Sequence, residues 1–391
     1  MREAVETLLD LAGIEVGGSQ PWDIAVHHPD FYRRVLAHRN LGLGEAYMDG
    51  WWDCPRLDMF FARLLQAEVE GRLSVTLPMA FRTLFHRAVN HQTRTRAREV
   101  VHRHYDLGND LYQAMLGPSM TYSCGYWRVA RTLEEAQRDK LELICRKLML
   151  KPGMRVLDIG CGWGTLALHA ARHHGVEVVG ITLSEPQRQF AEAACQGLPV
   201  TFRLQDYRDL PTDSFDRIVS VGMFEHVGHR NHPTFMKAVR THLAGDGLAL
   251  VHTIGGNRTQ AGGDPWIHRY IFPNGEIPSA LQIARSVEGR FVLEDWHNFG
   301  ADYDRTLMAW HANFLKHWPK LEPTYGQRFF RMWTYYLLSC AGAFRARNLQ
   351  LWQVVLSPQG LPGGFPIRDL REKSEEESLE FEQLDPAWEV P

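Results

Sequence analysis

No stretch of this sequence is hydrophobic over the length that a membrane-spanning helix needs. Its 391 residues contain no apolar run approaching the roughly 18 to 20 residues of such a helix. The N-terminus also lacks the basic and apolar regions of a secretory signal peptide. These absences argue against an integral helical membrane protein and against secretion. We expect a cytoplasmic protein that lies, at most, on the inner face of a membrane.

Paired cysteines are missing as well. The six cysteines are scattered without a C-x-x-C motif, which argues against a disulfide framework and favours reduced thiols. His226, His229 and His232 have the spacing of metal ligands, but no thiolate or carboxylate nearby in the sequence completes the set. We therefore predict no metal site.

A strong net charge is the third absence. The formal net charge of −3 gives no reason to expect a nucleic-acid partner. With 45% hydrophobic and 23% charged residues, the chain has a globular composition, and its length predicts two or three structural units. We expect a helical N-terminal domain over residues 1–72, because two apolar stripes recur there at helical spacing: Val5, Leu8, Leu9 and Ala12, then Leu57, Phe60, Phe61, Leu64 and Leu65.

Acidic residues are absent between Leu73 and Arg98, where arginines alternate with apolar residues. Arg82 and Arg87, with Phe81 and Phe85, give residues 73–98 the pattern of a basic amphipathic connector. Such a segment either lies against an anionic lipid surface or packs its apolar face on the core, and the pattern does not separate these alternatives. Residues 357–391 are rich in glutamate and predict a mobile acidic tail without chemistry.

Glycines punctuate a turn directly after a predicted strand, Arg155–Ile159. Gly160, Cys161 and Gly162 precede a helical pattern over residues 166–173, so the free N–H groups of that helix face the turn. The spacing is G-x-G-x-G and differs from the dinucleotide fingerprint. A ligand with an adenosine and a small carboxylate fits this turn, which favours S-adenosylmethionine; the alternative is a tight strand-to-helix corner.

Further predicted strands alternate with helical patterns, which indicates an α/β fold with a doubly wound, mostly parallel sheet. These strands cover residues 176–181, 200–204, 215–221 and 247–253. Ligands bind beyond the carboxyl ends of such strands. Polar residues stand at these ends, namely Asp158, Thr182, Asp206, Glu225 and His252. Taken singly, Glu225 also fits a strand-end cap and His252 a buried core histidine.

Several longer motifs resemble the cyclopropane-fatty-acid synthases, within the wider family of lipid-modifying methyltransferases that includes the mycolic-acid cyclopropane synthases. They are GLGEAYMDGWWDC (42–54), HYDLGNDLY (104–112), MTYSCGYW (120–127), VLDIGCGWG (156–164), VSVGMFEHVG (219–228), DPWIHRYIFPNG (264–275), EDWHNFGADYDRTL (294–307) and CAGAFRARNLQLWQVV (340–355). The first motif is similar to the phospholipid-acting branch. The resemblance implies a Rossmann-like class I methyltransferase domain over residues 99–356. Independently of it, segments 104–110 and 120–127 are aromatic, Gly-rich and polar, which makes them candidates for a lid over the cofactor.

The resemblance also implies a reaction. A methyl group passes from S-adenosylmethionine to a cis double bond of a phospholipid acyl chain, and loss of a proton closes a cyclopropane ring. The implied base is a bound bicarbonate ion, held by residues that match Cys124, Glu225, His252 and Tyr303 and by the backbone N–H of Ile254. Cys340 stands where a nucleophile is conceivable, but methyl transfer to an alkene needs none, so we interpret it as packing.

For the cofactor, the resemblance places Tyr122 and Ser123 near the methionine end, with Asp158 and Gly160 to Gly162 beside it. Thr182, Leu183 and Gln187 fall at the ribose, and Asp206 with Tyr207 at the adenine. An acidic residue usually stands where Thr182 does, so the ribose contact departs from the general pattern. We expect unsaturated phospholipids and an anionic membrane surface as partners, and a homodimer. The alternatives are a lipid methyltransferase that leaves a methyl or methylene branch, an N-methyltransferase of a soluble amine, and a lipid-binding protein without activity.

Overall fold

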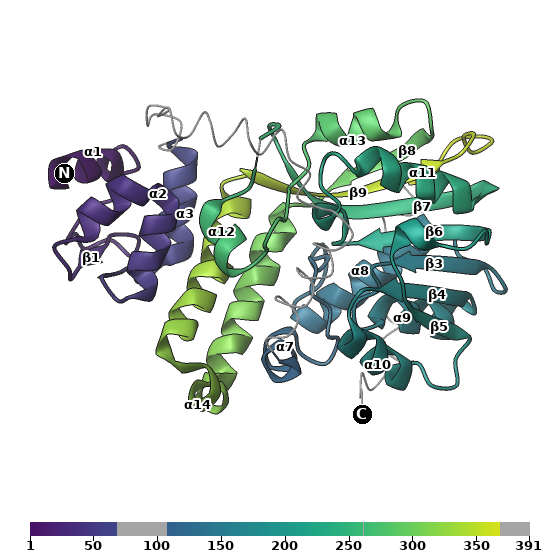
Figure 1. Cartoon of the computed structure of the whole chain (residues 1–391), viewed down its shortest axis with the longest axis horizontal. Coiled ribbons are helices and arrows are strands. Elements are labelled where there is room, and N and C mark those ends of the chain that lie inside the picture. Colours follow the sequence, from purple (N-terminus) through teal and green to yellow (C-terminus); the bar gives the residue numbers. More distant parts are fainter. Residues whose placement is uncertain (69–107, 261, 368–391) are drawn as a thin grey trace.

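The computed structural model describes residues 1–68, 108–260 and 262–367 (Figure 1). The predicted basic connector, with Phe81, Arg82, Phe85 and Arg87, lies outside the described residues, as does most of the predicted acidic tail. None of the helices in the described ranges combines the length and hydrophobicity that crossing a membrane requires.

A seven-stranded sheet forms the larger part of the molecule, in the order β5-β4-β3-β6-β7-β9-β8. β3 to β7 pair in parallel, whereas β9 runs antiparallel between β7 and β8. The strands are β3 Arg155–Ile159, β4 Glu177–Thr182, β5 Val200–Leu204, β6 Phe215–Val221, β7 Leu243–Gly256, β8 Val292–Asn298 and β9 Leu349–Ser357. The predicted α/β fold with a doubly wound sheet is confirmed.

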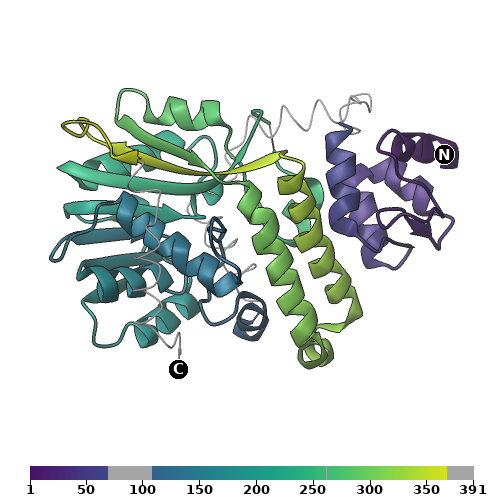
Figure 2. The ribbon, with the colours of Figure 1, turned by 180° about the vertical axis from the view of Figure 1, so that it is seen from behind.

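Helices α8 Leu133–Lys147, α9 Thr165–His174, α10 Glu185–Ala194, α11 His232–His242 and α13 Ala280–Val287 accompany this sheet (Figures 1 and 2). Their starts follow local chemistry. Ser184 caps α10 by accepting a hydrogen bond from the Gln187 N–H, as its position before Glu185 and Pro186 predicts. Thr132 and Glu135 form a capping box at the start of α8.

One strand is longer than its sequence pattern predicts. We expected residues 247–253, but β7 spans Leu243–Gly256. The apolar run covers only its buried middle. Pairing extends the ends, since Leu243 pairs with Phe215 of β6 and Gly256 with Leu349 of β9. Such partners are distant in sequence, and a local pattern does not reveal them.

The N-terminal unit is built from α1 Arg2–Asp10, α2 Phe31–Met48 and α3 Leu57–Gln66, with a small β1 Ala25–Val26 and β2 Trp52–Asp53 ribbon. Arg39 interrupts α2 with a positive φ of 49°. In the two predicted stripes, Val5, Leu9, Ala12, Leu57, Phe60 and Phe61 are buried, and Leu8, Leu64 and Leu65 are partly so.

Between this unit and the sheet lies α14 Ala301–Arg345, which folds back on itself at Gly326, where φ is 71° (Figures 1 and 2). Its second half packs closely on α3. A Cβ atom at Gly342 would lie 2.7 Å from the Asp58 carbonyl oxygen, so only glycine allows this approach. Arg345 spans the same contact and pairs with Asp58 of α3 and, at 2.9 Å, with Asp304 of α14.

Candidate active site

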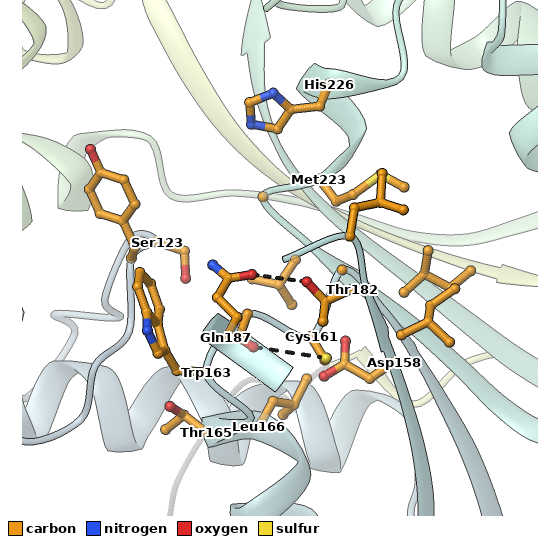
Figure 3. A pocket seen from close by; sticks show the side chains of 18 of the residues that line it. Ser123, Asp158, Cys161, Trp163, Thr165, Leu166, Thr182, Gln187, Met223 and His226 are labelled. Atoms are coloured by element: carbon orange, nitrogen blue, oxygen red, sulfur yellow. Dashed lines mark hydrogen bonds between the residues drawn. The ribbon is translucent and has the colours of Figure 1, made fainter. Parts of the chain in front are cut away.

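A pocket opens at the carboxyl ends of β3, β4 and β6, the edge that a doubly wound sheet uses for ligands (Figure 3). All eleven residues that we assigned to the cofactor line it, namely Tyr122, Ser123, Asp158, Gly160, Cys161, Gly162, Thr182, Leu183, Gln187, Asp206 and Tyr207. They come from the ends of β3, β4 and β5, from α10, and from the loop before α8. Of the two predicted lid segments, residues 120–123 reach the pocket, whereas residues 104–107 lie outside the described residues.

The glycine turn shapes the floor of the pocket. Gly160, Gly162 and Gly164 all have positive φ, at 84°, 55° and 83°. A Cβ at Gly164 would come within 2.7 Å of Ala191 in α10, so this glycine allows close helix packing. A Cβ at Gly162 would meet nothing within 4 Å, which means that this position faces open space. The turn therefore brings bare backbone to the ligand side.

The ends of β4 and β5 carry side chains that are already hydrogen-bonded. The Thr182 hydroxyl donates to Gln187 Oε1 at 2.9 Å and accepts from the Ser184 N–H at 3.1 Å (Figure 3). Asp206 accepts from the backbone N–H of Arg208 at 2.9 Å and pairs with its guanidinium at 2.5 Å. The hydroxyl hydrogen of Thr182 is thus used within the chain. Toward a ribose, this hydroxyl can therefore only accept a hydrogen bond, and a donor would have to come from a neighbouring residue.

Sequence reasoning missed several lining residues. Lys140 of α8 reaches the pocket although it is only 1% exposed. Its Nζ donates to Ser123 Oγ at 3.0 Å. Trp163, Met223 and His226 also line the pocket. Burial lowers the pKa of His226 to about 4, so its imidazole is neutral at pH 7.

Glu225 lies at the end of β6, in the short η2 Phe224–His226, and is 9% exposed. Its Oε1 accepts a hydrogen bond from the Ile254 N–H at 2.6 Å. Its Oε2 is buried and has no hydrogen-bond partner among the described residues. Burial raises the pKa of Glu225 to about 7, and the Ile254 N–H offsets part of that rise. This differs from our expectation that the Ile254 N–H faces bicarbonate, because here it is used on Glu225.

His252 stands two residues before Ile254 on β7 and is 1% exposed. Its Nδ1 contacts the Gln353 amide nitrogen at 3.3 Å. Because an amide nitrogen only donates, Nδ1 is the acceptor and the ring proton resides on Nε2. Burial holds the pKa of His252 well below its usual range, so the ring is neutral. The buried Nε2 has no partner in the described part of the chain, which leaves a hydrogen-bond donor unused.

Cys124 and Tyr303 are the remaining predicted bicarbonate residues. Cys124 is fully buried, and its sulfur lies 3.9 Å from the Thr306 hydroxyl, one turn after Tyr303 in α14. Burial raises the pKa of Cys124 well above its usual range, so it is a neutral thiol. Phe299, two residues before α14, has its ring 5.8 Å from that of His252. The side chains of Cys124, Glu225, His252 and Tyr303 are all buried, and the Glu225 carboxylate accepts a hydrogen bond directly from the Ile254 N–H.

An aromatic cluster extends from the pocket toward Tyr303. Tyr122 lies 5.2 Å from Trp310, and Trp310 lies 5.9 Å from Tyr303, both between ring centroids. Tyr336 donates or accepts a hydrogen bond at 2.8 Å with the Tyr122 hydroxyl, and its ring lies 5.9 Å from Phe272. The region between the glycine turn and α14 is consequently apolar and rich in π-faces.

Cys340 is half-buried near this cluster, and burial raises the pKa of its thiol to about 12. A thiol with so high a pKa is a poor nucleophile at pH 7, which agrees with its interpretation as packing.

The histidine series does not gather into a metal site. His229 pairs with Glu276 at 2.7 Å, and His232 stacks on Phe224 at 4.2 Å. A different group, Cys145, His169 and His174, has potential ligand atoms within 4.8 Å of one another. Both of these histidines already hydrogen-bond to Glu142, at 3.2 and 3.1 Å, so the group forms an internal hydrogen-bonded cluster.

Comparison with known proteins agrees with this geometry. A family model described as mycolic acid cyclopropane synthetase matches residues 91–354. The chain belongs to this family. It is also similar to the cyclopropane-fatty-acyl-phospholipid synthase of Escherichia coli strain K12, with 56% identity over 360 residues that cover 92% of this chain and 94% of that protein.

Solved structures of family members match a smaller part of the chain. The cyclopropane synthase MmaA2 from Mycobacterium tuberculosis has 33% identity and a TM-score of 0.63, covering 66% of this chain and 97% of that one. The mycolic acid cyclopropane synthase CmaA1, complexed with SAH and CTAB, has 31% identity and a TM-score of 0.61, with the same coverage. The E. coli match is longer and necessarily includes part of the N-terminal unit.

Proposed function

We propose that this protein transfers a methylene group from S-adenosylmethionine across the cis double bond of unsaturated acyl chains in membrane phospholipids. The products are cyclopropane fatty acids and S-adenosylhomocysteine. The observation that carries the proposal is the buried pair of unpartnered atoms, Glu225 Oε2 and His252 Nε2, beside a pocket of the cofactor type. The similarity to the E. coli phospholipid enzyme over 92% of this chain supports the substrate class.

The pocket suits S-adenosylmethionine in three respects. Its bare glycine turn allows close approach, its floor carries a buried carboxylate at Asp158, and Asp206 with Tyr207 stands where an adenine would end. The related CmaA1 was solved with SAH. We assign the eleven residues that line the pocket to cofactor binding on these grounds.

The residues beside the pocket fit a small oxyanion with one hydroxyl. Glu225 Oε2 is an unused acceptor, and His252 Nε2–H is an unused donor. An ion that both donates and accepts, such as bicarbonate, would satisfy both atoms, whereas a simple anion would leave Glu225 repelled. Cys124 and Tyr303 would complete the enclosure, and the Ile254 N–H would act by holding Glu225 in place. Bound there, bicarbonate would supply the base that takes a proton from the transferred methyl group.

The chain itself keeps the reacting region dry and nearly uncharged. Cys124 is fully buried, His252 is 1% exposed, and Glu225 and Tyr303 are each 9% exposed. An alkene is a weak nucleophile, and its attack on a sulfonium methyl group leaves a carbocation that water would capture. The π-faces of Tyr122, Tyr303 and Trp310 stabilise positive charge without offering a nucleophile. Exclusion of water and an aromatic wall are therefore what this chain contributes to the step.

Access to a bilayer is the second half of the proposal. We assign peripheral association with anionic membranes to residues 73–98, with the N-terminal unit beside them. The support is the sequence pattern of Phe81, Arg82, Phe85 and Arg87, together with the E. coli relative whose match extends into the N-terminal unit. The homodimer and the cytoplasmic location also stay predictions.

The deciding experiment is product analysis with the purified full chain. It uses vesicles of cis-monounsaturated phospholipid, S-adenosylmethionine, and buffer either stripped of bicarbonate or supplemented with it. Gas chromatography of the released acyl chains should show cyclopropane fatty acids, formed in proportion to bicarbonate. A methyl- or methylene-branched product would support the alternative lipid methyltransferase. Methylation of a soluble amine, with no lipid product, would move the protein to the N-methyltransferase alternative.

A further inference from the structure

Gln353 is a fully buried polar residue of β9 to which the function proposed above gives no role. The register of the sheet places it between His252 of β7 and His297 of β8. Its amide nitrogen donates to His252 Nδ1 at 3.3 Å. Its Oε1 is buried and has no hydrogen-bond partner among the described residues. The amide thus serves His252 while its own oxygen stays unsatisfied, and a cost of this kind calls for a functional reason.

His252 has a single ring proton, whose position matters. Burial, and after it the ammonium groups of Lys140 and Lys147, hold the pKa of His252 well below its usual range, so the ring is neutral. In a neutral imidazole one nitrogen donates and the other accepts. Lys147 is engaged elsewhere, at 3.1 Å from His297 Nδ1 and 3.0 Å from Asp295. The Gln353 amide is therefore the group that determines which nitrogen of His252 carries the proton.

The direction of the Gln353 hydrogen bond gives His252 the opposite polarity to a general base. In a Ser-His-Asp triad, a carboxylate accepts from Nδ1–H, so Nε2 has the lone pair that takes up a proton. Here an amide donates to Nδ1, so the proton is on Nε2 and this atom can only donate. A neutral ring with its second nitrogen already protonated can bind an anion but cannot remove a proton from the transferred methyl group.

We infer that Gln353 is a positioning residue that fixes His252 as a hydrogen-bond donor at Nε2. The inference rests on the function proposed above, in which an oxyanion with one hydroxyl satisfies both Glu225 Oε2 and His252 Nε2. With the opposite tautomer both of these atoms would be acceptors, and an ion with a single hydroxyl could satisfy only one of them. Gln353 thereby favours an ion that accepts at His252 and donates at Glu225, and it leaves the role of base to that ion.

The first measurement determines the tautomer of His252 directly. Long-range proton–nitrogen NMR spectra of the full chain, with isotope-labelled histidine, show which ring nitrogen of a neutral histidine carries the proton. The signals that disappear in His252→Gln assign this residue. We expect the proton on Nε2 in the wild-type chain at pH 7. A proton on Nδ1 would overturn the inference, because the Gln353 amide would then have to be an acceptor.

The second measurement separates positioning from packing. Gln353→Met keeps about the same side-chain volume and removes the donor. The bicarbonate concentration that gives half-maximal turnover should rise roughly fivefold to tenfold, the range for one lost hydrogen bond. Turnover at saturating bicarbonate should stay within about threefold of the wild type, and the affinity for S-adenosylhomocysteine should be unchanged. A general loss of structure would instead lower all three.

Gln350→Met is the matched control for Gln353→Met. Gln350 is on the same strand and is 6% exposed, but its amide bonds to Asn298 at 3.1 Å and to the Arg347 carbonyl oxygen at 2.8 Å. This variant should keep the wild-type dependence on bicarbonate. Equal changes in both variants, or no change in Gln353→Met, would overturn the inference. Wild-type turnover that ignores bicarbonate would instead refute the proposed base, while the spectra would still decide the tautomer.

Discussion

Glu142 and Glu225 are buried to nearly the same extent, at 6% and 9% exposure, in regions built on opposite principles. Between α8 and α9, Glu142 accepts hydrogen bonds from His169 at 3.2 Å and His174 at 3.1 Å. Burial alone would raise the pKa of Glu142, but these two partners outweigh it and hold the pKa well below its usual value. Glu225 Oε1 accepts from the Ile254 N–H, whereas Oε2 has no hydrogen-bond partner among the described residues. Burial raises the pKa of Glu225 to about 7, although interactions with Ile254 and Thr253 offset part of the rise.

The comparison separates a carboxylate that stabilises the fold from one that the fold tolerates. The partners of Glu142 belong to the chain, so its carboxylate is hydrogen-bonded before any ligand arrives. Glu225 Oε2 has no such partner among the described residues. An unsatisfied polar atom in a buried site costs free energy, and this cost is typical of binding and catalytic residues.

The largest expected effect is on turnover. Glu225→Gln should reduce cyclopropane formation roughly 100-fold or more, the range for disabled general-base catalysis, because the amide NH2 can no longer accept the hydroxyl of the ion. Its affinity for S-adenosylhomocysteine should be unchanged. Glu142→Gln is the control, since it is equally buried but remote from the pocket, and it should retain activity within a few fold. Equal losses in both variants would show that the contrast between the glutamates is only one of packing.

The second prediction concerns stability against pH, and the two glutamates should differ in sign. The folded pKa of Glu225 is above its usual 4.5, so the folded state binds the extra proton and loses stability as pH rises from about 4.5 to 7. Removing the charge with Glu225→Gln should therefore stabilise the ligand-free protein at pH 8 by roughly 2 to 4 kcal/mol, and far less at pH 5. Chemical denaturation at the two pH values measures this difference.

For Glu142 the folded pKa is depressed, so its stabilisation is present above pH 4.5 and is lost as pH falls below that value. Glu142→Gln should cost about 2 kcal/mol at pH 8, since it removes charged hydrogen bonds. If both variants destabilised the protein at pH 8, Glu225 would have partners that satisfy it in the folded state.

The two regions also differ in how far the sequence predicts them. Asp158, Thr182 and Asp206 could be placed in one pocket because each stands at or just beyond the carboxyl end of a strand that the sequence pattern predicts. Lys140 escaped notice because α8 is rich in charged residues, and a lysine there has the pattern of a solvated face. Its burial depends on the loop that carries Ser123, which no local pattern positions.

The region around Glu225 depends still more on tertiary contacts. His252 contacts Phe299, and Cys124 contacts Thr306 of α14, so the surroundings of both depend on residues far away in the sequence. Residue patterns alone left each with an ordinary structural interpretation, and only the family resemblance grouped them. The resemblance gave the Ile254 N–H a different partner from the one observed, because the 2.6 Å contact with Glu225 depends on how η2 packs against β7.

A third prediction tests the cofactor side alone. Gly162→Leu should weaken S-adenosylmethionine binding roughly tenfold or more, because the side chain would project into space that is open in the ligand-free pocket. Gly153→Leu is a matched control, since Gly153 also has a positive φ, at 82°, and open space, but lies before β3 and outside the lining of the pocket. Calorimetry, with circular dichroism as a check of folding, distinguishes them. Unchanged affinity in Gly162→Leu would contradict the assignment of the turn.

A fourth prediction concerns delivery of the lipid. The double variant Arg82→Glu/Arg87→Glu should weaken sedimentation with anionic vesicles roughly tenfold or more at low salt, because each surface arginine contributes about 1 kcal/mol. The effect should shrink as ionic strength rises. S-Adenosylhomocysteine affinity should stay the same. Vesicle binding that ignores both charge reversal and salt would favour the alternative in which this segment packs on the core.

The smallest effect is expected at Cys340, which lies near the aromatic cluster but has no role in the proposed chemistry. Burial holds the pKa of this thiol at about 12, so almost none of it is the nucleophilic thiolate at pH 7. The transferred carbon goes directly from sulfonium to alkene, which leaves no step for a covalent enzyme intermediate. Cys340→Ala should therefore keep kcat within about threefold and cost on the order of 1 kcal/mol of stability from lost packing. Cys340→Ser keeps about the same side-chain volume and removes the thiol, so it separates the effect of lost packing from the effect of a lost thiol. A loss of turnover comparable to that of Glu225→Gln, in both variants and with S-adenosylhomocysteine affinity intact, would place Cys340 among the reacting groups.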